Sequence, residues 1–304
     1  MINFKKISLA IAMAGLLVCS ALQAMDDHNT LLASNQIFLN EMLGMAIQSG
    51  NKDQEDQIKK YVKIGADVNS ECVINNRSQT PLVAAILNQN PDIIKYLVEK
   101  ASARVDLAPQ IDNFLLFTPV HYAAMIRNLD ILKLVLSGRV NGGVSAVNLT
   151  DKCGNTPLHL AVRQGNVENA QLLIERGADV NAKGNCGNTP LFEAVVNEHI
   201  RLIELLSDKG AKVTSGLASA CRAGQDKVVA VLLKNHEITL TDISKSSEQL
   251  NEFIRSIFDK IDQTNKEKIM KITEMLERKK AELEERCNNA GTMLVVKPGI
   301  PEIQ

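Results

Sequence analysis

The stretch from Asp151 to Asn181 reads DKCGNTPLHLAVRQGNVENAQLLIERGADVN, and it determines the fold of the chain. Thr156 has a hydroxyl that can cap a helix N-terminus, and Pro157 follows at the first helical position, where its missing N–H costs nothing. Apolar residues continue at helical spacing, and the two helical segments end at Gly165 and Gly177. The stretch therefore predicts a hairpin of two short helices.

The same unit recurs along the chain. Its pentapeptide GNTPL stands at 154–158 and again at 187–191, which is 33 residues later. The starts at Thr80 and Thr118 each precede the next such threonine by 38 residues, so two connecting loops must hold five extra residues each. We expect one of these insertions mostly between Asp106 and Thr118, because insertions in surface loops leave a stack of repeats intact.

A 33-residue period with a Thr-Pro-Leu-His core resembles the ankyrin repeat. The resemblance implies an all-α solenoid of about six helix-turn-helix repeats, joined by extended finger loops and followed by a C-terminal helical extension. A degenerate unit at 39–69 would be the first repeat. The expected domains are a secretory signal peptide at 1–24, a linker at 25–38, the ankyrin-repeat domain at 39–240, the helical extension at 241–290 and a tail at 291–304.

The N-terminus has the pattern of a targeting segment. Lys5 and Lys6 precede an apolar run from Ile7 to Val18, and the small residue Ala24 follows as a candidate signal-peptide cleavage site. The run is shorter than the roughly 20 residues that span a bilayer, so we expect a cleaved signal peptide. The protein would then be periplasmic or secreted, and the pattern of this signal peptide favours a bacterial source.

Composition limits the classes of function. The net charge is −1, and without Lys5 and Lys6 the chain has 32 basic and 35 acidic groups, which gives −3. This balance does not indicate a nucleic-acid partner. Tryptophan is absent and aromatic residues make up 3% of the chain, so the core must be built from Leu, Ile, Val and Ala.

Two helices are expected after the repeats. Apolar residues between 250 and 261 fall at three- and four-residue steps and predict an amphipathic helix that covers the last repeat. A second, highly charged helix is expected from Lys266 to Cys287, with sparse apolar residues at a heptad-like spacing. It is either a solvated helix or a coiled-coil segment through which the protein oligomerises.

Patterns for chemistry are weak. Five cysteines lie outside the leader, with no Cys-x-x-Cys or His-x-x-x-His pair, so we expect no metal, no cofactor and no catalytic residue. Cys153 and Cys186 hold equivalent finger positions roughly 10 Å apart, which is too far for a disulfide. The ankyrin resemblance implies that His121 and His159 are structural and hydrogen-bond near their repeat starts. The alternative is an enzymatic or redox activity in the C-terminal extension or the free thiols.

The columns of the repeat point to a partner site. The ankyrin resemblance implies that a partner binds along the finger tips and the free face of the first helix of each repeat. The finger of the third repeat, just before Thr118, is apolar, whereas its neighbours are polar. The predicted apolar docking patch and its basic rim consist of Phe114, Leu115, Phe117, Met125, Ile126, Arg77, Lys152 and Arg163. Alternatively, the insertion before Thr118 folds over and buries 114–117. We therefore expect an exported, non-enzymatic protein-protein interaction module with an unidentified protein partner.

Overall fold

The computed structural model describes residues 28–49, 53–74, 77–108, 117–138, 140, 145–234, 238–257 and 263–293. The chain divides into two compact units, Met1–Lys152 and Cys153–Gln304. In each unit, helices pair as hairpins; the first helix of a pair is called inner and the second outer.

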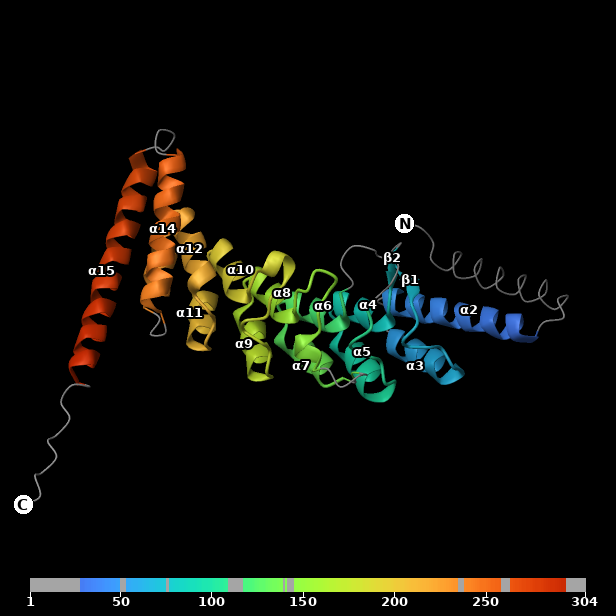
Figure 1. Ribbon diagram of the computed structural model, residues 1–304. Helices are drawn as coiled ribbons and strands as arrows, with labels where there is room; N and C mark the ends of the chain where they lie inside the picture. Colours follow the sequence, from blue (N-terminus) through green and yellow to red (C-terminus); the bar gives the residue numbers. More distant parts are fainter. Residues whose placement is uncertain are drawn as a thin grey trace, which may run out of the picture. The chain divides into compact units, whose positions relative to one another are not determined.

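The first unit contains three such pairs among its described residues. They are α2 (His28–Ser49) with α3 (Gln54–Ile64), α4 (Pro81–Leu87) with α5 (Pro91–Lys95), and α6 (Pro119–Met125) with α7 (Leu129–Leu136). A π turn, η1 (Tyr96–Lys100), prolongs α5, and a 3-10 turn, η2 (Ala146–Asn148), follows α7. Strands β1 (Cys72–Ile74) and β2 (Arg77–Gln79) form an antiparallel hairpin in which Val73 pairs with Ser78. Figure 1 shows α4 beside α6 and α5 beside α7, so inner and outer helices form separate rows.

The second unit contains three more pairs and two longer helices. The pairs are α8 (Pro157–Arg163) with α9 (Val167–Glu175), α10 (Pro190–Val196) with α11 (Ile200–Asp208), and α12 (Thr214–Arg222) with α13 (Asp226–Leu232). A 3-10 turn, η3 (Asn185–Gly187), lies in the finger before α10. Helices α14 (Leu240–Ile257) and α15 (Gln263–Met293) follow, α14 packing on α12 and α15 on α13 and α14. The expected all-α repeat solenoid with a helical C-terminal extension is confirmed.

Threonine and asparagine define where the helices begin. The Thr80 hydroxyl accepts a hydrogen bond from the Val83 N–H at 3.4 Å, and Pro81 takes the first helical position, as the sequence predicts. The outer helices α5, α7 and α9 begin differently, because asparagine side chains cap them. These caps are Asn90, Asn128 and Asn166, each accepting the N–H of the third residue after it.

The core is aliphatic, as the composition predicts. Every residue of α8 from Pro157 to Val162 is buried, and α4 is buried in the same way from Pro81 to Ile86. A fully buried Leu or Ile side chain contributes about 1.5–3 kcal/mol relative to an exposed one. Because each seven-residue inner helix is too short to be stable alone, this burial between neighbours is what holds it.

The stretch predicted to be a linker, 25–38, is largely helical. Helix α2 begins at His28 and runs without interruption to Ser49. The sequence contains no glycine or proline between 28 and 43, so nothing breaks the helix there. The signal peptide at 1–24 lies outside the described residues, as do 294–304 of the predicted tail, and the remaining domain boundaries stay predictions.

One of the five residues inserted before Thr118 lies in a helix rather than in the finger. In the fourth repeat the Ala178 N–H donates to Leu173 O, five residues earlier, at 2.9 Å. In the second repeat the equivalent Ala103 N–H donates to Leu97 O, six residues earlier, at 2.8 Å. The π turn η1 absorbs the additional residue, which the loop-only interpretation of the insertion missed.

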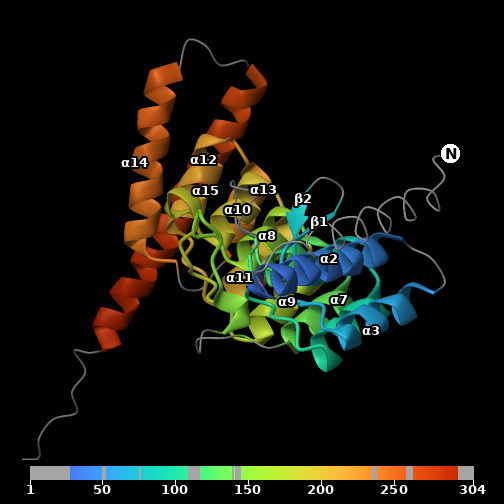
Figure 2. The same ribbon diagram turned by 90° about the vertical axis from the view of Figure 1, so that its right-hand side faces the viewer.

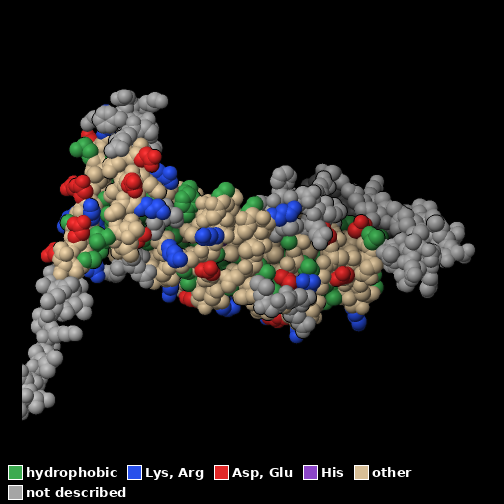
Figure 3. Space-filling model, in the orientation of Figure 1, with side chains coloured by type: hydrophobic (Ala, Val, Ile, Leu, Met, Phe, Trp, Pro, Cys, Tyr) green, Lys and Arg blue, Asp and Glu red, His purple; other side chains and the backbone are tan. Residues whose placement is uncertain are grey.

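Helix α15 uses its apolar residues within the chain. Ile272, Leu276 and Leu283 are buried, and α15 packs on α13 and α14. Most of its exposed residues are charged, with Met270 as an exposed apolar exception, and Figure 3 shows acidic and basic side chains interspersed over this helical pair. The heptad-like spacing therefore marks an intramolecular seam. Within the described ranges, no helix has both the length and the apolar character required to cross a membrane.

Candidate functional site

Hydrogen bonds at the starts of two repeats engage the two predicted structural histidines. The Thr156 N–H donates to His159 Nδ1 at 3.1 Å, and the Thr118 N–H donates to His121 Nδ1 at 3.3 Å. Each histidine is the third helical residue and completes a capping box with its threonine. Both rings are fully buried, so the expectation that they hydrogen-bond near their repeat starts is confirmed.

His159 also connects its repeat to the next one. Because Nδ1 accepts an N–H, the proton of the neutral ring is on Nε2, which donates to Asn188 O at 3.1 Å. In the fifth repeat Phe192 takes the position of His159, and Thr189 caps α10 alone. With both ring nitrogens of His159 engaged in structure, neither serves as a catalytic base.

The exposed ends of the inner helices in the first unit form the candidate site. The residue seven positions after each start threonine is the last residue of its inner helix, and it is not buried. This column contains Leu87, Met125, Arg163 and Val196. Leu87 is 43% exposed and Val196 is 52% exposed, whereas the residues just before them, Ile86 and Val195, are fully buried. In the first unit the column is apolar at both Leu87 and Met125.

The structure places three predicted patch residues at or near the ends of α6. Met125 and Ile126 are half-buried at its C-terminus. Phe117 is half-buried at its N-terminal side, with its ring stacked on His121 at a centroid distance of 5.8 Å and edge-on to Tyr122 at 5.6 Å. Part of the Phe117 surface therefore covers its own repeat, and the rest is open to solvent.

The other predicted residues are placed less favourably for one continuous patch. Phe114 and Leu115 lie outside the described residues. Arg77 lies in β2 opposite Ile74, and its side chain is outside the described set. Lys152 is exposed at the end of the first unit.

Arg163 belongs to the second unit, where it binds Glu193. Its Nη2 and Nε donate to the two carboxylate oxygens at 2.9 and 3.2 Å, which joins the ends of α8 and α10. Glu193 is nearly buried, at 8% exposure, so the bidentate pair provides it with the partner that a buried carboxylate needs. This pair was not predicted from the sequence, and neither was Leu87, although Leu87 shares its column with Met125.

Within the described ranges, the reactive side chains are not gathered into a catalytic arrangement. Burial raises the pKa of the Cys72 and Cys221 thiols to about 12, so both are neutral and unreactive at physiological pH. Cys186 is exposed at a finger tip, and its Sγ donates to Asn185 Oδ1 at 3.4 Å. The described part of the chain contains no cluster of three His, Cys, Asp or Glu side chains that could hold a metal ion. A shallow pocket of exposed and half-buried polar side chains between α14 and α15 contains neither histidine nor cysteine.

Comparisons with known proteins agree with this architecture. A family described as Ankyrin repeats (3 copies) matches residues 43–144 and 121–216, more than half of the chain. The B-cell lymphoma 3 protein homolog of Mus musculus is 34% identical over 110 residues, 36% of this chain and 23% of that protein. NF-kappa-B inhibitor alpha of Sus scrofa is 36% identical over 110 residues, 36% of this chain and 33% of that protein.

A solved structure shows the same similarity. The crystal structure of the ankyrin repeat domain of Bcl-3, a member of the IkappaB protein family, matches with a TM-score of 0.56 and 26% sequence identity. The match covers 70% of this chain and 97% of that chain. The chain thus spans nearly the whole solved domain, but only about a quarter to a third of the two curated relatives named above.

Proposed function

Since the chain belongs to the ankyrin-repeat family, we propose that it is a non-enzymatic module that binds a partner protein. One observation carries the proposal. Leu87 and Met125 end neighbouring inner helices of the first unit, and each presents apolar surface to solvent where the preceding helical residues are buried. Apolar side chains exposed side by side on a repeat array are typical of a protein interface.

The proposed docking face consists of Leu87, Met125, Ile126 and the open part of Phe117. The predicted apolar finger residues Phe114 and Leu115 would enlarge it, and Arg77 and Lys152 would supply its basic rim. Arg163 is not included, because it lies in the second unit and is bound to Glu193. Apolar anchors of this kind contribute most of the binding energy when a partner removes them from water.

The double variant Leu87→Asp/Met125→Asp tests the face. Both side chains lie at helix ends and are not fully buried, so the fold should tolerate the change, whereas a bound partner would have to bury two carboxylates. Immobilised wild-type protein should capture a partner from host-cell or culture extract, and the double variant should capture at least about tenfold less. Mass spectrometry identifies the captured protein.

Val196→Asp is the matched control. Val196 holds the same column position in the second unit, outside the proposed docking face, and is 52% exposed, so this variant introduces one such carboxylate in the same local setting. Its capture should equal that of the wild type. Equal capture by the double variant would reject the face, and capture of no protein by the wild type would reject the binding function.

Export of the protein is proposed from the leader. The basic residues Lys5 and Lys6, the apolar run and Ala24 support a signal peptide cleaved after residue 24 and a periplasmic or secreted location. The relatives named above are animal proteins, so the proposal of a bacterial source rests on the leader alone. N-terminal sequencing of the protein recovered outside the cytoplasm should begin at Met25. Recovery of only the uncleaved chain inside the cell would reject export.

Two alternatives have less support. Oligomerisation through 266–287 would need a free apolar seam, but Ile272, Leu276 and Leu283 are already buried in the same chain. Redox activity would need a reactive thiol, and the two buried thiols have pKa values of about 12. This leaves the exposed Cys186 and Cys287 and the half-buried Cys153 to be tested by thiol titration.

A further inference from the structure

An asparagine of one repeat hydrogen-bonds the loop that follows the outer helix of the next repeat. In the second unit, Asn181 Oδ1 accepts from the Lys212 N–H at 2.8 Å, and Asn181 Nδ2 donates to Gly210 O at 3.0 Å. Gly210 has a left-handed backbone (φ 81°). One side chain thus satisfies a carbonyl at the left-handed residue and an N–H two positions later, groups that the helix itself leaves unpaired.

The bond from the loop N–H to the asparagine recurs in the first unit. Asn69, which stands at the position of Asn181 in its repeat, accepts from the Arg104 N–H at 2.8 Å. Arg104 is two positions after Ser102, which is again left-handed (φ 59°). Both of these loops therefore receive a hydrogen bond from an asparagine of the repeat before them.

The first repeat has no earlier repeat among the described residues, yet its loop is satisfied in the same way. Gly65 is the left-handed residue (φ 112°), and the groups in question are Gly65 O and the Asp67 N–H. Asn40 Oδ1 accepts from the Asp67 N–H at 2.8 Å, and Gln36 Nε2 donates to Gly65 O at 2.9 Å. Gln36 Nε2 also lies 3.0 Å from Asn40 Oδ1, which connects the two side chains.

Helix α2 can do this because it is far longer than other inner helices. It has 22 residues, whereas α4 has seven, and the additional turns lie at its N-terminal end. Gln36 and Asn40 are four residues apart, so they project from one face of the helix, and that face contacts the loop after α3. Figure 2 shows α2 running alongside α3.

We propose that the N-terminal half of α2 is a built-in cap that takes the place of a preceding repeat. Gln36 and Asn40 together make the two hydrogen bonds that Asn181 alone makes in the second unit. The loop of the first repeat then has no unpaired group at these two positions for another repeat or a second copy of the chain to satisfy. Removal of a leader ending at Ala24 would leave this cap intact, since α2 begins at His28.

Hydrogen exchange measured by mass spectrometry tests the cap on the full chain. In Asn40→Ala, peptides covering 65–69 should exchange about tenfold faster than in the wild type, because Asp67 loses its acceptor. Gln36→Glu should act in the same direction, since a carboxylate cannot donate to Gly65 O. Glu41→Ala is the control, because Glu41 is the exposed neighbour of Asn40 and should leave the exchange of 65–69 unchanged.

Hydrogen exchange of the loop at 102–105 distinguishes a local role of the cap from general destabilisation of the first unit. Because Asn69, and not α2, hydrogen-bonds that loop, the loop should keep its wild-type protection from exchange in the Asn40 and Gln36 variants. Unchanged exchange at 65–69 in Asn40→Ala would overturn the proposal. So would an increase that is equally large at 65–69 and 102–105 in both variants, because it would report loss of the unit rather than loss of a cap.

Discussion

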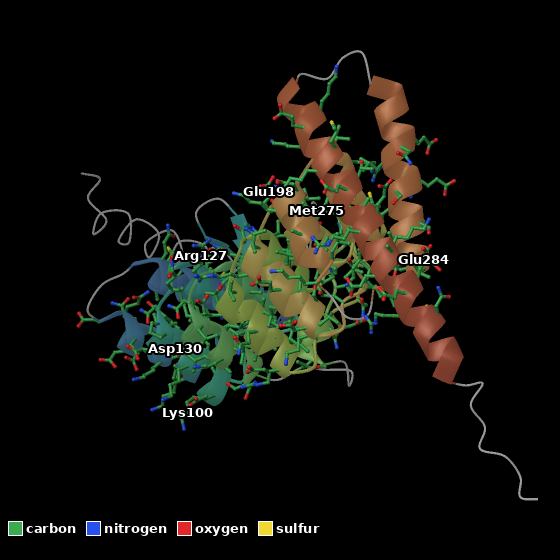
Figure 4. The ribbon with its side chains drawn as sticks, turned by 90° about the vertical axis from the view of Figure 1, so that its left-hand side faces the viewer. Lys100, Arg127, Asp130, Glu198, Met275 and Glu284 are labelled. Carbon is green, nitrogen blue, oxygen red and sulfur yellow. The ribbon has the colours of Figure 1, made fainter. Side chains whose placement is uncertain are left out.

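At the scale of single residues, the turn between inner and outer helices shows where the sequence departs from its own pattern. The turn uses a left-handed residue, which is a glycine at Gly165 (φ 69°) and Gly224 (φ 67°). Gln89 (φ 52°) and Glu198 (φ 55°) occupy the same position in other repeats, and Figure 4 labels Glu198 at this turn. A side chain in this conformation costs about 1–2 kcal/mol, because its Cβ crowds the following carbonyl oxygen.

Replacing Gln89 by glycine should therefore stabilise the protein. Gln89→Gly relieves the crowding and gives back part of the gain as chain entropy, so the free energy of unfolding should rise by about 0.5–1 kcal/mol. Gly224→Ala is the reverse experiment. A Cβ at Gly224 would meet no atom within 4 Å, so only backbone strain acts, and that variant should lose about 1 kcal/mol. Urea unfolding measures both, and a loss of stability in Gln89→Gly would contradict the explanation.

At the scale of elements, α15 shows how a helix with few apolar residues is held. Its apolar seam packs on α13 and α14, and Lys271 adds an ion pair to Asp226 of α13 at 2.6 Å. The hydrogen bond from Lys271 holds the pKa of the Asp226 carboxyl below its usual range. A carboxylate whose pKa is lowered by folding contributes stability above its unfolded pKa, near 4, and loses that contribution as the pH falls below it.

Lys271→Ala should show this pH dependence. At pH 7 the variant should be less stable than the wild type by about 0.5 kcal/mol, the usual size for an exposed pair. As the pH falls from about 4 through the lowered pKa of the folded Asp226 carboxyl, the difference should shrink, because protonation removes the charge that Lys271 binds. Lys268→Ala, which removes an exposed cation from the same helix, serves as the control and should match the wild type. A stability difference that is the same at pH 3 and pH 7 would exclude the ion pair as its source.

At the scale of the whole molecule, most of the fold could be predicted from the repeat period. The Thr-Pro starts and the glycine stops are local signals, and they locate the inner helices that begin at Pro81, Pro119, Pro157 and Pro190, because each signal acts within one turn of chain. The columns then identify side chains that leave the core, such as Met125. They do so because every repeat places its columns in equivalent environments.

Other features depend on contacts between repeats, and they cannot be predicted from local sequence signals. The Arg163 pair with Glu193 joins two repeats, so neither residue alone predicts it. Helix α2 extends through a stretch that resembles a linker, because Gln36 and Asn40 reach a loop that the sequence does not mark as their partner. The apolar finger at 114–116 lies outside the described residues, so exposure of the finger itself stays a prediction.

The π turn at Tyr96–Lys100 has a consequence for how repeats of this kind are compared and redesigned. A helix can take up one additional residue as a π turn while both of its ends keep their places. A residue gained or lost between two repeats therefore need not lie in a loop. An alignment that assigns every length difference to the fingers would shift Ala103 and Val105 out of register, although both are fully buried like core residues of other repeats. Deleting one residue within 96–100 offers a route to a shorter array module with its finger untouched.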